Sequence, residues 1–89
     1  MTEAEALVGI AEVAREHLAI GGGIAPEARL VEDLGLDSLR LLTLAAEVEN
    51  RFRIRLEPED EAAIETVGDL ARTVARKVEA ARRDGADSE

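Results

Sequence analysis

This chain contains no cysteine, tryptophan or tyrosine, and its only aromatic residue is Phe52. Without cysteine it can form neither a disulfide framework nor a thiolate metal site. A core with one aromatic side chain must be built from leucine, isoleucine, valine and alanine, which suits packed helices better than a β-sandwich. No apolar run approaches the roughly 20 residues that a membrane-spanning helix needs. These absences favour a small helical protein.

The chain also lacks a catalytic constellation. Its 89 residues allow one domain with one modest core, which leaves no room for a deep catalytic cleft. The lone histidine, His17, lies far from Ser38 in the sequence, and no Gly-x-Ser-x-Gly elbow surrounds that serine. The acidic run at 59–61 lacks the spaced ligands and central glycine of a calcium loop. We expect neither an enzyme nor a metal site, and we interpret His17 as a surface residue.

Charge of positive sign is scarce. The net charge is −9, which disfavours nucleic acid and anionic membranes as partners because both repel the protein. The acidic start, residues 1–5, does not resemble a secretory or organellar signal. We therefore expect a cytoplasmic protein that does not insert into membranes.

Local signals define the first helix and the connection after it. Thr2, with Glu5 three residues later, forms a capping-box pattern and predicts a helix that the triple glycine at 21–23 ends. A long connection over residues 19–37 comes next, and such a connection needs side chains that pin it to the core. The expected pins are Leu30, Leu34 and Leu36.

Three further helices and one connector complete the pattern. A second helix is predicted over 38–51, with an apolar stripe of Leu41, Leu44, Ala45, Val48 and Phe52. Residues 52–56 alternate with period two but have no partner strand, so an extended connector is expected. Pro58 precedes a short helix over 59–64. Thr66 and Asp69 then form a cap for a fourth helix, whose core stripe is Val67, Leu70, Ala71, Val74 and Val78.

The predicted fold is all-α: a small, irregular four-helix bundle with three longer helices, one short helix and a long loop between the first and second. The bundle is expected to occupy residues 1–81, and the polar residues 82–89 a disordered tail.

The most informative stretch is Leu34–Leu39, at the start of the second helix. Asp37 is a good N-cap, because its carboxylate can accept from the unpaired N–H groups of the next residues. Ser38 then occupies the first helical position, where the helix dipole would favour a phosphate on its hydroxyl. Gly35 allows a tight turn into the helix.

The ten-residue run from Leu30 to Leu39 closely resembles the segment around the modified serine of acyl carrier proteins. The resemblance in element lengths extends from about Glu3 to Val78, and it implies the same four-helix fold. It also implies that Ser38 accepts 4′-phosphopantetheine from coenzyme A, through a separate phosphopantetheinyl transferase, while Asp37 positions Ser38. Acyl groups would then travel as thioesters on the arm.

The same resemblance implies that the second helix docks on acyl-loading, condensing and downstream biosynthetic enzymes, with the protein acting as a monomer. The expected docking residues are Leu39, Arg40, Leu42, Ala46, Glu47 and Glu49. This helix departs from the fatty acid carriers, which have an acid where Arg40 stands and commonly one at Thr43. A specialised lipid, fatty acid or polyketide pathway is therefore favoured over housekeeping fatty acid synthesis.

Three questions stay open at the level of sequence. The cargo could be aminoacyl or peptidyl instead of acyl, and a protein of another class, an unmodified helical interaction module, would share the bundle. Small side chains at Ala45, Ala46, Ala62 and Ala63 could also leave space for an acyl chain between the second and third helices. Close helix packing explains the same alanines.

Overall fold

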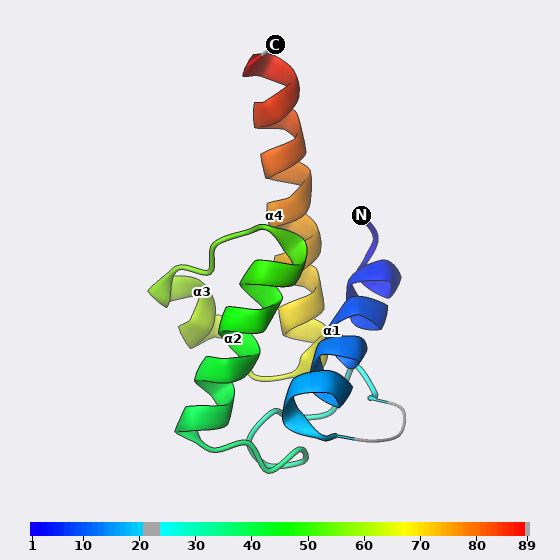
Figure 1. The fold of residues 1–89 in the computed structure, drawn as a ribbon, viewed down its shortest axis with the longest axis vertical. Helices are drawn as coiled ribbons and strands as arrows, with labels where there is room; N and C mark the ends of the chain where they lie inside the picture. The colour runs from blue at the N-terminus through cyan, green and yellow to red at the C-terminus, as the bar shows by residue number, and fades with distance from the viewer. Residues whose placement is uncertain (21–23, 89) are drawn as a thin grey trace.

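The computed structural model describes residues 1–20 and 24–88, and these residues form four helices. In chain order they are α1 (Glu3–Leu18), α2 (Ser38–Phe52), α3 (Pro58–Ala63) and α4 (Val67–Ser88), as Figure 1 shows. In the described part of the chain, β-pairing amounts to one isolated antiparallel bridge between Arg29 and Thr66. The predicted all-α four-helix bundle is confirmed.

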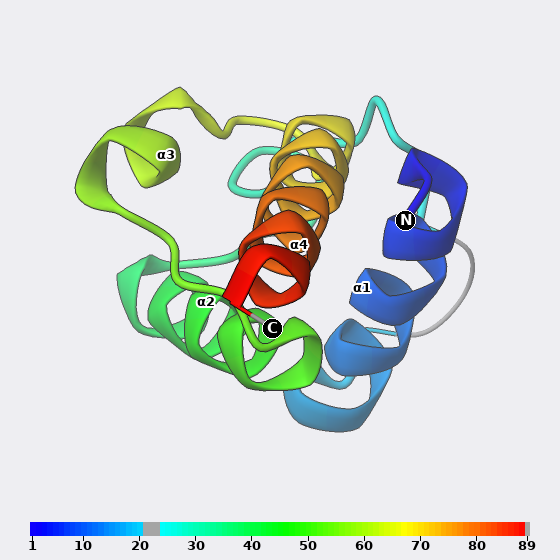
Figure 2. The ribbon, with the colours of Figure 1, turned by 90° about the horizontal axis from the view of Figure 1, so that it is seen from above.

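The core lies where α1, α2 and α4 meet, because each of these helices contributes one apolar stripe. Seen from above, α4 lies between α1 and α3, with α2 running along one side (Figure 2). The stripes predicted for the second and fourth helices are confirmed: their members are buried or packed against the buried cluster. The most deeply buried large side chains are Ile10, Leu36, Val48, Val67 and Val74.

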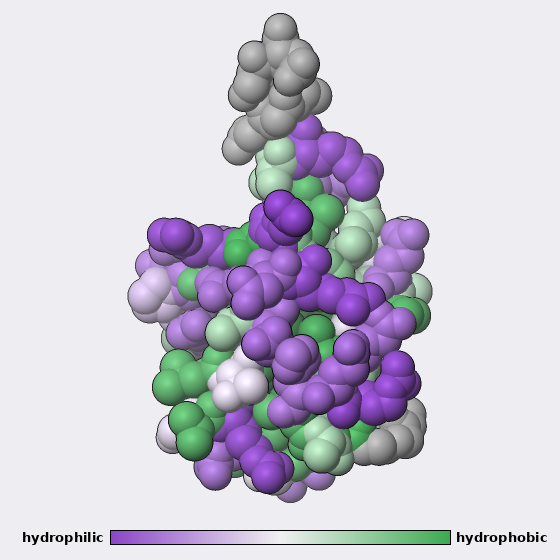
Figure 3. Space-filling view, in the orientation of Figure 1, coloured by the Kyte–Doolittle hydropathy of each residue, from purple (hydrophilic) through white to green (hydrophobic). Residues whose placement is uncertain are grey.

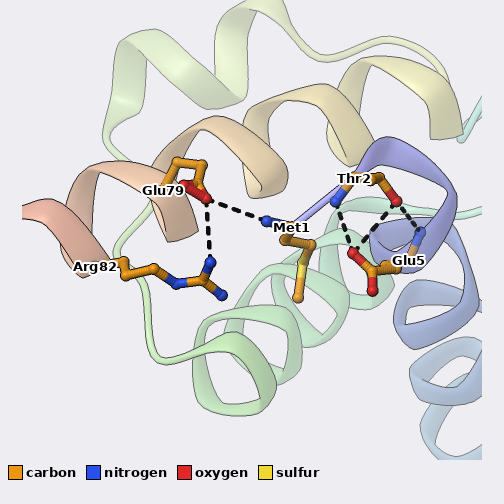
Figure 4. A network of polar contacts seen from close by, with 5 residues as sticks. All are labelled: Met1, Thr2, Glu5, Glu79 and Arg82. Atoms are coloured by element: carbon orange, nitrogen blue, oxygen red, sulfur yellow. Dashed lines mark hydrogen bonds and ion pairs between the residues drawn. The ribbon is translucent and has the colours of Figure 1, made fainter.

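The cap predicted for α1 forms as expected. The Glu5 backbone N–H donates to the Thr2 hydroxyl (3.1 Å), and the Thr2 backbone N–H donates to the Glu5 carboxylate (2.8 Å). Figure 4 shows this cap beside a second contact, in which the Met1 ammonium lies 3.3 Å from a carboxylate oxygen of Glu79 on α4. The start of the chain is thus joined to the last helix.

The other end of α1 lies where the predicted connection over residues 19–37 begins. The helix ends at Leu18, and Ala19 adopts the left-handed conformation (φ 57°), with its N–H bonded to the carbonyl of Ala14. The triple glycine that was expected to end it, at 21–23, lies outside the described residues. The helix therefore stops before the glycines, because a left-handed alanine already closes its last turn.

The long connection before α2 is held by side chains and by backbone. Leu30 and Leu36 are buried and Leu34 is partly buried, which confirms the three expected pins. The Leu30 N–H donates to the Glu65 carbonyl (3.0 Å), and the Val67 N–H donates to the Ala28 carbonyl (3.0 Å). These bonds tie the approach to α2 to the start of α4.

The short helix α3 is attached chiefly by charge. It starts at Pro58, one residue before the predicted start, and none of its residues is buried. Its Asp60 carboxylate lies 2.7 Å from the Lys77 ammonium and 3.2 Å from the Arg76 guanidinium, both on α4. The hydrogen bond from Lys77 is the main reason why the pKa of Asp60 falls below its ordinary value.

The start of α4 agrees with the prediction and its end does not. The Asp69 N–H donates to the Thr66 hydroxyl (3.0 Å), and Asp69 in turn accepts from the Thr66 N–H (3.1 Å), which completes the predicted cap. At its other end α4 continues to Ser88 and extends beyond the other helices (Figure 1), where the sequence predicts a tail from residue 82. Alanine and arginine at 80–83 are strong helix formers, which suits the continuation. The domain boundary between residues 81 and 82 stays a prediction.

Candidate functional site

A single tight turn precedes the site in the chain and ends at Gly35. Gly35 closes this turn in the left-handed conformation (φ 68°), with its N–H donating to the Val31 carbonyl (3.0 Å). Asp33 fixes the start of the turn, because its carboxylate accepts from the Arg29 N–H (2.7 Å). Leu36, the next residue, is only 2% exposed. The buried Leu36 side chain therefore fixes the chain directly before Asp37 and Ser38.

Asp37 is the N-cap of α2, as predicted. Its backbone is extended, and its carboxylate accepts from the Arg40 N–H at 2.9 Å. Its carbonyl accepts the first helical bond, from the Leu41 N–H, at 2.9 Å. Ser38 is the first residue of α2 and is exposed. Its hydroxyl is therefore open to another protein, at the helix end where partial positive charge gathers.

Ser38 also borders a cavity of about 380 Å³ between α2, α3, α4 and the long connection. This volume lies in the range of about 300–1,000 Å³ that is usual for ligand pockets. The lining is mostly aliphatic: Leu30, Ser38, Leu41, Leu42, Leu44, Ala45, Leu56, Glu61, Ile64 and Leu70.

The cavity corrects the hypothesis of an alanine-lined space. Of the four alanines expected to border it, only Ala45 does; Ala46, Ala62 and Ala63 are exposed and lie outside the lining. Leucines form the wall instead, and they come from α2, from α4, from the connection before α2 (Leu30) and from the connector after it (Leu56). Sequence reasoning missed Leu30, Leu56 and Glu61 as site residues, because folding alone brings these distant segments together.

Apolar side chains are exposed beside Ser38. Leu39 is 72% and Leu42 65% exposed, and Ala46 is exposed as well, as predicted for these three residues. Val31, on the turn before Gly35, adds a further exposed side chain (56%) that the sequence did not single out. Figure 3 shows apolar surface over the start of α2. Leu39, Leu42 and Ala46 follow one another on α2 at spacings of three and four, so they form an exposed apolar patch suited to a protein partner.

The charged residues expected in docking fall into two groups. Arg40 is exposed and forms no ion pair with any residue that the structure describes. Glu47 lies 3.3 Å from the His17 ring on α1, and Glu49 accepts from the Leu56 N–H at 2.8 Å. The structure thus leaves Arg40 available to a partner and gives both acids contacts within the molecule. Their part in docking stays a prediction.

Across residues 1–20 and 24–88, no helix combines the length and the apolar character that crossing a membrane requires.

Known proteins resemble this chain over most of its length. The family model described as a phosphopantetheine attachment site matches residues 9–74. The meromycolate extension acyl carrier protein of Mycobacterium leprae is 34% identical over 89 residues, covering 99% of this chain and 76% of that relative. Its counterpart in Mycobacterium tuberculosis is 37% identical over 71 residues, 79% of this chain but only 62% of that relative's length.

A solved structure is similar as well. The structure of a candidate acyl carrier protein from Mycobacterium tuberculosis superposes with a TM-score of 0.74 and is 37% identical in sequence. The match covers 79% of this chain and 95% of the solved one.

Proposed function

This chain belongs to the acyl carrier proteins, and from that premise we propose that Ser38 is the residue to which its 4′-phosphopantetheine is attached. The group supplies a flexible arm with a terminal thiol, on which acyl intermediates are carried as thioesters. Carrier proteins of this kind are generally not enzymes. They serve a phosphopantetheinyl transferase and a set of biosynthetic enzymes.

One observation carries the proposal for Ser38: its hydroxyl is exposed at the first position of α2, directly after the cap Asp37. An incoming transferase can reach it without unfolding the bundle. A phosphate on this oxygen would lie at the positive end of the helix dipole, near backbone N–H groups that have no partner within the helix. The residues around Ser38 therefore fit a phosphodiester-linked group.

In the proposed step, the Ser38 hydroxyl oxygen bonds to the coenzyme A phosphorus that bears the pantetheine arm. The phosphoanhydride bond of coenzyme A breaks, and adenosine 3′,5′-bisphosphate leaves. The hydroxyl proton passes to a base that the transferase supplies. Asp37 positions the serine by fixing the first turn of α2 through Arg40 N–H.

The test is the intact mass of the protein after incubation with coenzyme A and a phosphopantetheinyl transferase. The chain offers a matched control, since its only other serine, Ser88, also follows an aspartate. Wild type and Ser88→Ala should gain the mass of phosphopantetheine, and Ser38→Ala should gain nothing. Modification of Ser38→Ala, or loss of modification in Ser88→Ala alone, would contradict the proposal.

We further propose that the cargo is an acyl chain of a specialised lipid pathway. The relatives named above are carriers of meromycolate extension or of acyl groups, which favours acyl over aminoacyl cargo. The aliphatic cavity beside Ser38 also suits a hydrocarbon chain. Docking through Leu39, Arg40 and Leu42 on condensing and acyl-loading enzymes, the monomeric state and the cytoplasmic location stay predictions.

A further inference from the structure

The cavity next to Ser38 has a chemical asymmetry. Among the ten residues that line it in the described part of the chain, Glu61 alone carries a charge. Its carboxylate has no hydrogen bond and no ion pair with the residues that the structure describes, whereas its neighbour Asp60 is paired twice. A charged side chain beside aliphatic ones will discriminate between ligands by polarity, because an unpaired carboxylate seeks a donor and repels another anion.

The position of Glu61 is fixed by its helix. The contacts of Asp60 with Lys77 and Arg76 join α3 to α4. Glu61 and Ile64 are three residues apart, so they lie on one side of this turn, and both line the cavity. Ile64 also packs against the buried cluster. Glu61, an exposed residue, therefore lies at the rim of the cavity that Ser38 borders.

We propose that Glu61 is a specificity-determining residue for the cargo. This inference rests on the proposed attachment at Ser38, since only a tethered acyl group is brought to this cavity. The Glu61 carboxylate favours an acyl group that bears a hydrogen-bond donor, such as a hydroxyl, near its thioester end. It disfavours a carboxylated acyl group, because two like charges would meet next to aliphatic walls.

The experiment measures how strongly the protein protects each acyl thioester from cleavage by hydroxylamine; this protection is called shelter below. The phosphopantetheine-loaded protein is charged with a saturated acyl group, a 3-hydroxyacyl group or an acyl group with a carboxylate on its third carbon, all of one chain length. Hydroxylamine then cleaves the thioesters, and each rate is divided by that of the same free pantetheine thioester. The wild type should shelter the 3-hydroxyacyl group about threefold to tenfold better than the saturated one, the range expected for a partly exposed bond to a charge.

Three variants separate the effect of Glu61 from general stability. Glu61→Ala should abolish the preference for the hydroxylated group, and Glu61→Gln should improve shelter of the carboxylated chain because the repulsion is gone. Glu59→Ala, at an exposed α3 position outside the lining, should leave all rates unchanged. Circular dichroism confirms that each variant is folded.

Two results would overturn the inference in different ways. A preference that persists in Glu61→Ala, or that Glu59→Ala removes equally, would refute the role of Glu61 while the carrier function stands. A protein that takes up no phosphopantetheine at Ser38 would refute the proposed function, and this inference with it.

Discussion

Asp37 shows how much one residue contributes to this site. Its carboxylate holds the Arg40 N–H, and its carbonyl starts the hydrogen-bond ladder of α2. The three caps at Thr2, Asp37 and Thr66 were all predictable from the sequence, since each depends on residues two to four positions apart. The end of α1 at Leu18 agrees with the predicted start of the connection at residue 19. The left-handed conformation of Ala19 was not predictable, because alanine has no sequence signal for it comparable to glycine.

Replacement of the cap should weaken the helix that presents Ser38. We expect Asp37→Ala to lower the free energy of unfolding by about 1 kcal/mol, the usual cost of a lost N-cap, and Asp37→Asn to lower it by much less. Urea denaturation followed by circular dichroism measures both. Equal losses in the two variants would show that the Asp37 side chain does not act as a cap.

Asp69 should make part of the stability depend on pH. Hydrogen bonds from the Glu65 and Thr66 backbone N–H groups lower its pKa below the ordinary value of 3.8. A lowered pKa in the folded state means that this stabilisation is complete above the unfolded pKa and is lost as the pH falls through the folded one. We expect Asp69→Asn to flatten the loss of stability below about pH 4. The free energy of unfolding is measured by urea denaturation at each pH. The same loss below about pH 4 in the variant and the wild type would contradict this.

At the scale of helices, α1 and α2 pack closely at Gly9, a position of α1 that has no side chain to signal the contact. Gly9 of α1 is buried against the ring of Phe52, and a methyl group there would overlap that ring. Two polar contacts flank the same interface: Arg51 pairs with Glu12, and Glu47 with His17. The apolar stripes predicted which faces meet, but the partners across the interface depend on the register of two helices far apart in sequence.

The contact between Gly9 and Phe52 predicts that the effect of Gly9→Ala on the free energy of unfolding changes sign when the ring is removed. In the wild type, Gly9→Ala should lower the free energy of unfolding by about 1 kcal/mol, since overpacking outweighs the gain in helix propensity. In a Phe52→Leu background, the same change should raise it by up to about 1 kcal/mol, because the ring is gone. A double-mutant cycle measures the coupling. An effect of Gly9→Ala that is the same in both backgrounds would exclude contact with Phe52.

At the scale of the whole molecule, the fold and the position of Ser38 followed from the sequence, whereas the cavity did not. The stripes and caps defined four helices, and the run from Leu30 to Leu39 singled out Ser38 as the proposed attachment site. The cavity joins Leu30, Leu56 and Leu70, which lie in three segments separated along the chain. Only the packing of those segments shows that leucines, and not alanines 46, 62 and 63, enclose it.

Arg40 is an exposed cation on a protein whose net charge is −9. We expect this cation to take part in choosing partner enzymes. Arg40→Glu should change the kcat/KM with cognate enzymes by about threefold to tenfold and leave phosphopantetheine transfer intact, because charge complementarity mainly sets association rates. Arg15→Glu, an exposed α1 change of equal charge, is the control and should have little effect. Equal effects of both variants would mean that only net charge matters.

The central claim is that Ser38 of this acyl carrier protein bears the phosphopantetheine. Its most direct test is a fragment mass spectrum of the wild-type protein after modification by a transferase. We predict that the added group maps to fragments that contain Ser38 and is absent from those that contain Ser88 only. A group located on Ser88 or on a threonine, with Ser38 unmodified, would contradict the account.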